Sequence, residues 1–226
     1  MVLDVKRLLL LLALLLSLGS LSAVELSMGA EGGLNYNLVD TSTRWDYTDW
    51  DSFIACEAGL ALKVQFTSRV ALSTGARYML KSAYYTKEYN GTTVDSYAVL
   101  HHFLEFPLTL QLYGGSGKSR FFLGLGGYAG IRLFETHIGS SLTLMNDTEH
   151  YFRNVELNSS DNRFDGGLIA EAGFTVPSRR GEFYLRLRYQ YSLTSLAKDT
   201  QSDVTHTYID TVSVTAGFLF HLWGKV

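Results

Sequence analysis

Hydrophobic and polar residues alternate with a period of two along most of the chain from Glu25 onward. In the first stretch, for example, Leu26, Met28 and Ala30 are separated by small polar or glycine residues. This period is typical of β-strands that bury one face and leave the other in a different environment. The pattern predicts an all-β protein with eight strands, at residues 25–38, 53–66, 70–80, 99–112, 121–134, 163–176, 183–193 and 209–220.

The two faces of these strands differ sharply in charge. One face is apolar and carries no charged residue at the positions assigned to it, whereas the other carries acids and bases in nearly equal numbers. In a soluble sandwich the apolar faces would meet in a core, and in an outer-membrane barrel they would face lipid while the charges line the lumen. The charged face comprises Glu25, Glu31, Glu57, Glu105, Asp165, Glu171 and Asp210 with Lys63, Arg77, Arg132, Arg163, Arg186 and Arg188.

The lengths of the connections favour the membrane barrel. They alternate long and short, as an up-and-down barrel with both termini in the periplasm requires, and strands of ten or more residues suit a tilted membrane crossing. We therefore expect an eight-stranded antiparallel up-and-down transmembrane β-barrel; a secreted sandwich or a lipocalin-type barrel is the alternative. The expected connections are 39–52, 67–69, 81–96, 113–120, 135–162, 177–182 and 194–208. For 135–162 both a short helix and a strand pair remain open.

The N-terminal segment has the order of a secretory signal. Lys6 and Arg7 precede the apolar run from Leu8 to Leu16, which is followed by small residues up to Ala23. The run is too short for a spanning helix, and residues 24–226 contain no stretch of 18 apolar residues. We expect a signal peptide at 1–23 and one barrel domain at 24–226, in the bacterial outer membrane.

Four segments resemble the small outer-membrane β-barrel family of diderm bacteria, the eight-stranded porin-like group near OmpX, OmpA and OmpW. The segments are Leu104-Glu105-Phe106-Pro107-Leu108, Leu123-Gly124-Leu125-Gly126-Gly127-Tyr128, Phe164-Asp165-Gly166-Gly167-Leu168 and Arg188-Tyr189-Gln190-Tyr191-Ser192-Leu193-Thr194. The resemblance implies outer-membrane lipid and the barrel-insertion machinery as partners. The chain departs from the family at its end, where Phe218 and Phe220 are followed by His221 to Val226.

Composition excludes several functions. With 19 basic and 22 acidic residues the formal net charge is −3, which leaves no basic footprint for nucleic acid. A single cysteine, Cys56, cannot form an internal disulfide or a thiolate metal cluster, and metal-ligand spacing is absent from the sequence. We expect no cofactor.

An eight-stranded barrel is so narrow that its interior side chains fill it. Balanced charges therefore predict a hydrogen-bonded plug, because buried charges need partners and a selective pore would show an excess of one sign. The expected lumen charge network is Glu31, Glu57, Lys63, Arg77, Glu105, Arg132, Asp165, Glu171, Arg186 and Arg188.

The long connections carry the candidates for specific binding. Their aromatic and basic residues suit contact with a protein or glycan on a host or cell surface, and equally suit an aromatic girdle at the outer leaflet. These residues are Arg44, Trp45, Tyr47, Trp50, Tyr84, Tyr85 and Tyr89.

Three functional interpretations follow from the sequence. The first is a non-enzymatic structural barrel whose loops are available for binding. The second is a narrow conduit for small or hydrophobic solutes, lined by inward apolar residues such as Phe53, Phe103, Phe122, Phe134 and Ile169. The third is a lipid-modifying enzyme, for which the histidines near the outer end would need a nucleophile and an acid that the sequence does not place beside them.

Overall fold

The computed structural model describes residues 24–43, 48–89, 92–115, 119–142, 148–157, 161–196 and 204–224. The predicted signal segment 1–23 lies outside these ranges. In the part of the chain that the structure describes, no helix is long and apolar enough to cross a membrane.

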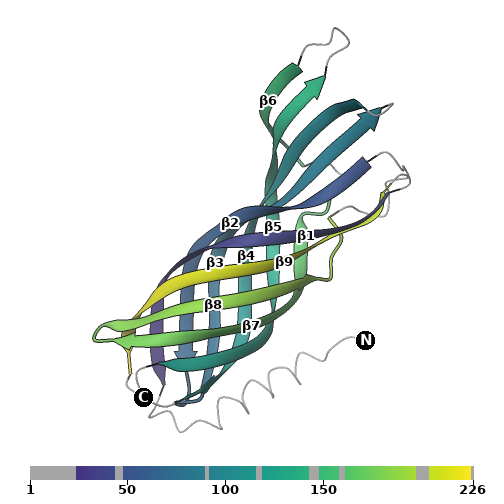
Figure 1. Ribbon diagram of the computed structural model, residues 1–226. Coiled ribbons are helices and arrows are strands. Elements are labelled where there is room, and N and C mark those ends of the chain that lie inside the picture. Colours follow the sequence, from purple (N-terminus) through teal and green to yellow (C-terminus); the bar gives the residue numbers. More distant parts are fainter. Residues whose placement is uncertain are drawn as a thin grey trace.

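The described chain folds into one antiparallel sheet that closes on itself (Figure 1). The order β4-β3-β2-β1-β9-β8-β7-β5 is closed by pairing of β4 with β5, and β6 pairs with β5 outside this ring. Closure leaves no open edge among the eight wall strands, as the hydrocarbon region requires. The strands are β1 (Glu25–Thr43), β2 (Thr48–Gln65), β3 (Val70–Tyr89), β4 (Thr92–Gly114), β5 (Arg120–Leu142), β6 (Thr148–Val155), β7 (Phe164–Ser178), β8 (Gly181–Ser192) and β9 (Val204–Trp223).

The eight-stranded up-and-down barrel is therefore confirmed, but the predicted strand limits were too short. Long parts of the expected connections 39–52, 81–96 and 135–162 are paired strand, and 135–162 forms the strand pair rather than the helix. The reason is that the apolar and polar contrast ends where the wall leaves the hydrocarbon, whereas backbone pairing continues beyond it.

The two faces of the wall are inside out relative to a soluble protein. Outward leucines such as Leu123 and Leu125 are 67% and 71% exposed, whereas the inward Gln190 and Ser27 are fully buried. Cys56 is exposed on the outward face. Two of the charges assigned to the inner face do not lie there: Arg163 is exposed just before β7, and Asp210 is only partly buried and accepts a hydrogen bond from the exposed Tyr189.

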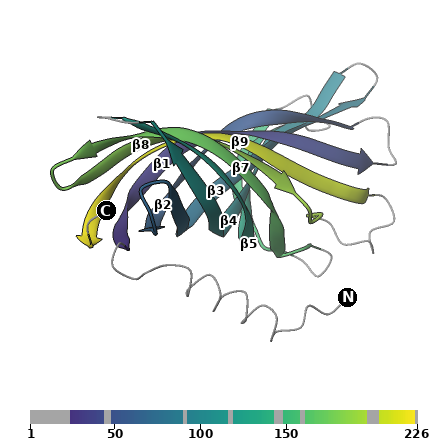
Figure 2. The ribbon, with the colours of Figure 1, turned by 90° about the horizontal axis from the view of Figure 1, so that it is seen from below.

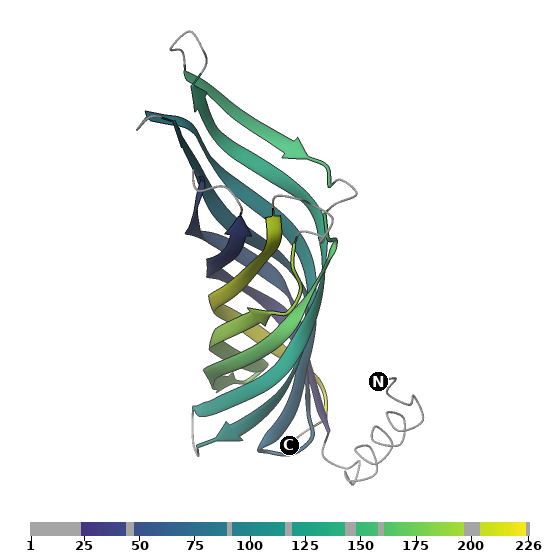
Figure 3. The same ribbon diagram turned by 90° about the vertical axis from the view of Figure 1, so that its right-hand side faces the viewer.

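The two ends of the barrel differ in height. At one end, which we call the short-turn end, the wall strands are joined by short turns, and the start of β1 pairs with the end of β9 at Leu26 and Trp223 (Figure 2). At the other, the long-strand end, the β3–β4 and β5–β6 hairpins extend well beyond the start of β7 and the end of β8 (Figure 3). The wall is consequently tall on one side and low on the other.

Candidate functional site

The barrel interior holds all ten residues of the predicted lumen network. Each lies on the inward face of its strand, because inward positions recur every second residue, and each is at most 9% exposed. They come from seven of the eight wall strands: Glu31 on β1, Glu57 and Lys63 on β2, Arg77 on β3, Glu105 on β4, Arg132 on β5, Asp165 and Glu171 on β7, and Arg186 and Arg188 on β8.

A middle cluster forms around Glu105. Arg77 is its cross-strand partner and donates to Oε2 from Nη2 at 2.8 Å and from Nε at 3.2 Å. Gln190 donates to the same oxygen at 3.1 Å, and Arg77 Nη1 lies 3.7 Å from Glu57 Oε2. Charge-assisted contacts of this kind compensate the desolvation of the buried groups.

Lys81 joins this cluster, although the sequence interpretation missed it. Its ammonium lies 3.2 Å from Glu105 Oε1 and 2.5 Å from Asp165 Oδ2. The expected third strand ended at Leu80, one residue before Lys81, whereas β3 continues to Tyr89. Lys81 follows Arg77 by four residues, so the period of two would have placed both on the inner face had the strand been extended.

A lower cluster of four charges lies nearer the short-turn end. Glu171 Oε2 is 3.0 Å from Arg188 Nη2 and 3.7 Å from Arg186 Nη1, and its other oxygen accepts from Thr109 and Gln111. Arg186 also pairs with Glu31, which accepts a hydrogen bond from Tyr184 at 2.5 Å.

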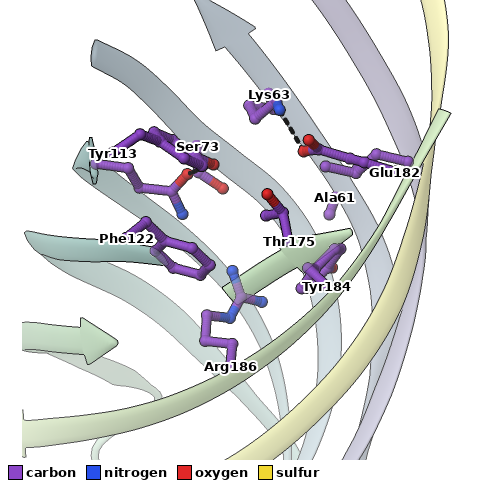
Figure 4. Close-up of a pocket in the computed structure, with 11 residues that line it drawn as sticks. Ala61, Lys63, Ser73, Tyr113, Phe122, Thr175, Glu182, Tyr184 and Arg186 are labelled. Carbon is purple, nitrogen blue, oxygen red and sulfur yellow. Dashed lines mark hydrogen bonds and ion pairs between the residues drawn. The ribbon is translucent and has the colours of Figure 1, made fainter. Parts of the chain in front are cut away.

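The lowest layer contains the ion pair of Lys63 and Glu182, which Figure 4 shows beside Tyr184 and Arg186. Arg120 also contacts Glu182, at 3.3 Å. The free space here is about 10 Å³ for the centre of a water-sized sphere, which is at the lower limit for one water molecule. Glu182 was assigned to a turn in the sequence interpretation because the apolar pattern begins only at Phe183.

A last charged layer lies toward the long-strand end. Glu135 pairs with Arg132 at 3.1 Å and with the ring nitrogens of His101 and His137 at 3.0 and 3.3 Å. Arg132 also donates to the backbone carbonyl of Leu196 at 3.1 Å. A separate apolar layer of four tightly packed residues, Met79, Phe103, Leu196 and Ile209, fills the lumen as well.

Across these layers eight carboxylates face seven cations, and each has an opposite charge within 4.0 Å. The carboxylates are Glu31, Glu57, Glu105, Glu135, Asp161, Asp165, Glu171 and Glu182, and the cations are Lys63, Arg77, Lys81, Arg120, Arg132, Arg186 and Arg188. The acids and bases of the described lumen are thus all paired and nearly balanced in number.

The candidate binding residues of the loops are placed differently from the prediction. Arg44, Trp45 and Tyr47 lie outside the described residues, whereas Trp50, Tyr84, Tyr85 and Tyr89 lie on paired strands rather than in loops. These four residues lie on strands because β2 begins earlier and β3 ends later than the sequence predicts.

An aromatic row crosses three strands near the long-strand end. Tyr85 on β3 contacts Tyr97 on β4 with ring centroids 4.6 Å apart, and Tyr97 stacks on His137 of β5 at 5.2 Å. Gly139 on β5 makes room for this row, because a Cβ there would lie 2.3 Å from Cβ of Tyr97. Sequence reasoning found Tyr85 but not its partners, since pairing depends on strand register.

Histidine 102 lies in a hydrogen-bonded chain rather than in a catalytic triad. Its Nδ1 contacts the Tyr78 hydroxyl, and its Nε2 is 2.9 Å from Thr136 Oγ1. The Thr136 hydroxyl in turn donates to Asn154 on β6 at 2.8 Å. The Thr136 hydroxyl therefore gives its proton to the amide oxygen of Asn154 and not to the imidazole of His102. Such an arrangement does not activate the hydroxyl as a nucleophile.

A second hydroxyl–histidine pair, Ser27 with His221, lies at the short-turn end. Ser27 Oγ lies 3.1 Å from His221 Nδ1, and Glu25 contacts the same nitrogen. A triad requires the hydroxyl and the acid on opposite ring nitrogens, so this geometry is unsuited to nucleophilic catalysis. Among the described residues, no group of three or more histidine, cysteine or acidic side chains is arranged to hold a metal ion.

Solved structures with a similar fold are outer-membrane proteins. OprG from Pseudomonas aeruginosa aligns with a TM-score of 0.51 and 16% identity over 89% of this chain and 98% of OprG. Neisserial surface protein A gives 0.45 and 9% over 87% and 97%, and the outer membrane protease OmpT from Escherichia coli gives 0.42 and 10% over 88% and 96%. No curated protein sequence matches the chain.

A family model described as "Outer membrane protein beta-barrel domain" matches residues 22–198. The match covers well over half of the chain and includes seven of the eight wall strands. The protein therefore belongs to the outer membrane protein β-barrel domain family and is a multi-pass protein of the bacterial outer membrane.

Proposed function

We propose that this protein is a closed, non-conducting barrel with a structural role, which presents its long-strand end to partners at the cell surface. In this orientation the short-turn end and both ends of the barrel chain face the periplasm, as is general for outer-membrane barrels. The observation that carries the proposal is the nearly balanced charge network across the lumen, in which every charge has an opposite partner.

The network opposes ion passage in two ways. An ion moving along the lumen would have to displace buried pairs such as Arg77 with Glu105, whose separation leaves uncompensated charge. Selective pores instead carry rings of one sign of charge. Proteoliposomes containing the folded chain should accordingly take up K⁺ and small sugars no faster than protein-free liposomes.

The raised hairpins supply the surface for binding. Tyrosine offers a rigid amphipathic ring that makes contacts at low entropic cost, and the aromatic row of Tyr85, Tyr97 and His137 groups such rings on three adjacent strands. The partner class that suits this surface is a protein or glycan of another cell.

Adhesion of bacteria that display the barrel tests this part of the proposal. Binding to cultured epithelial cells and to immobilised extracellular-matrix protein should fall when Tyr85 and Tyr97 are both changed to alanine. Tyr191→Ala is the matched control, because Tyr191 is half exposed on the outward face of β8. Equal adhesion by both variants and the parent would refute a role for the aromatic row.

A conduit for small hydrophobic solutes is the second candidate, and the apolar layer of Met79, Phe103, Leu196 and Ile209 is the observation that favours it. Phe53 and Phe134 do not add to that layer, since Phe53 is 44% exposed and Phe134 stacks on His102. Faster uptake of a small apolar dye into proteoliposomes carrying Phe103→Ala than into those carrying the parent would favour the conduit.

A lipid-modifying enzyme receives no support from the two hydroxyl–histidine contacts described above, because neither orients a nucleophile. Turnover of labelled lipid A by the folded barrel is the direct test. Our proposal expects none.

A further inference from the structure

The turns at the short-turn end carry exposed positive charge. Arg69 lies in the turn between β2 and β3, and Arg179 with Arg180 form the turn between β7 and β8; all three are exposed. None of the three has a carboxylate within 4.0 Å among the described residues. The acids at this end, Glu25 and Glu182, are already paired with other groups. We call Arg69, Arg179 and Arg180 the basic rim.

An apolar surface adjoins the basic rim. Phe66 lies three residues before Arg69 and Phe183 three residues after Arg180, and these rings are 39% and 60% exposed on the outward face. Phenyl rings beside guanidinium groups match a membrane interface, where the rings enter the acyl region and the charges remain at the headgroups.

An open groove of about 640 Å³ lies beside the rim, between β4, β5 and β7. Its lining is almost entirely apolar and comprises Leu112, Tyr113, Gly114, Phe121, Phe122, Leu123, Ala172, Gly173 and Phe174. Arg69 is next to this groove, because its carbonyl accepts a hydrogen bond from the Tyr113 backbone at 2.7 Å. The turn that carries Arg69 therefore borders the apolar groove.

The opposite end has the opposite character. Its exposed acids include Asp40, Asp51 and Glu156, whereas no acid at the short-turn end is exposed among the described side chains. The positive charge of the rim is thus a local feature of a chain whose net charge is −3.

We propose that the basic rim binds the phosphate of anionic phospholipids in the periplasmic leaflet and that the adjoining groove holds one of their acyl chains. The charge of the rim selects an anionic headgroup, and the lining of the groove selects hydrocarbon. This inference goes beyond the proposed function, since it holds whether or not the lumen conducts. It requires only that the short-turn end meets the phospholipid leaflet.

Native mass spectrometry of the detergent-folded chain tests the proposal. Equal amounts of phosphatidylglycerol and phosphatidylethanolamine are added, and the lipid adducts are counted. We expect phosphatidylglycerol adducts to dominate and to be lost in the triple variant R69Q/R179Q/R180Q, with about a fivefold weakening for each arginine removed. The control R153Q/R163Q removes two exposed arginines from the long-strand end and should keep the adducts.

Two further experiments test the role of the groove and the alternative that the rim binds cell-wall polymer instead of lipid. Leu123→Ser should reduce adducts of both lipids while the preference for phosphatidylglycerol remains. Equal adducts of the two lipids on the parent, or unchanged adducts on a triple variant that still shows heat-modifiable migration, would overturn the proposal. Loss of co-sedimentation with purified sacculi by that variant, without loss of lipid adducts, would likewise overturn it by identifying cell-wall polymer as the ligand.

Discussion

Arg77 on β3 and Glu105 on β4 are direct cross-strand neighbours, and Nη2 of the arginine donates to the carboxylate at 2.8 Å. Both side chains are at most 1% exposed. The same carboxylate receives Lys81 and Gln190, so one glutamate on β4 joins residues of β3 and β8. The strand register thus determines the electrostatics of the lumen, because it decides which buried charges meet.

Removing Glu105 should destabilise the barrel. Glu105→Ala leaves Arg77 and Lys81 short of a counter-charge in the interior, and breaking a buried pair in this way costs about 3–5 kcal/mol of unfolding free energy. Urea unfolding in detergent or lipid vesicles, followed by tryptophan fluorescence, measures the change. The control Glu156→Ala removes an exposed acid and should leave the midpoint in place. A Glu105→Ala barrel as stable as its parent would contradict the paired-plug description.

Glycine 217 provides room for Tyr184. A Cβ at this position would lie 2.5 Å from the tyrosine ring, whose hydroxyl donates to Glu31. Gly217→Ala should therefore displace the ring and lower stability by about 1–3 kcal/mol. Gly32→Ala is the comparison, because the nearest non-neighbouring atom to its Cβ would be 3.7 Å away. Equal midpoints for the two variants in urea would show that Tyr184 is not held as described.

The Thr136 hydroxyl links β5 to β6. It bonds His102 on one side and Asn154 on the other, and it is 3% exposed. Thr136→Val keeps the shape but removes both bonds, at about 1 kcal/mol each. Amide hydrogen exchange in residues 148–155 should then become at least about fivefold faster, while the wall strands keep their protection. Unchanged exchange in β6 would mean that this contact does not hold the hairpin.

Cysteine 56 reports which face of β2 meets lipid. As the single cysteine of the chain, it accepts one bimane label, and its outward position predicts strong quenching of that label by lipids brominated on their acyl chains. A label on Ser213→Cys in a Cys56→Ser background should not be quenched, because Ser213 is inward and 1% exposed. The reverse result would place the apolar face inside, as in a soluble barrel.

Sequence reasoning recovered the barrel and the inward position of its charges for one physical reason. One face of each strand meets lipid and the other meets the filled lumen. Apolar and polar residues therefore alternate along the strand, as outward Leu123 and inward Glu171 illustrate. Strand ends were harder to locate, because the contrast between the apolar and the polar face of a strand disappears beyond the hydrocarbon region. Lys81 was therefore placed in a connection, and for the connection that contains β6 the sequence left a helix and a strand pair open.

The partners within the lumen were not predictable from the sequence. Lys81 meets Asp165 from a distant part of the chain, and Lys63 meets Glu182 across the barrel. Such contacts depend on the closure of the sheet and the stagger of its strands, which the alternation of a single strand does not encode. The aromatic row depends on register in the same way.

Single-channel recording in planar bilayers tests the closed lumen most directly. The folded chain is inserted in 1 M KCl, with a heat-modifiable gel of the same preparation to show that the barrel has formed. We predict a silent bilayer for the parent, and for Glu156→Ala as a surface-charge control. Well-resolved conductance steps from the folded parent would contradict the account and would make the charges around Glu105 part of a pathway.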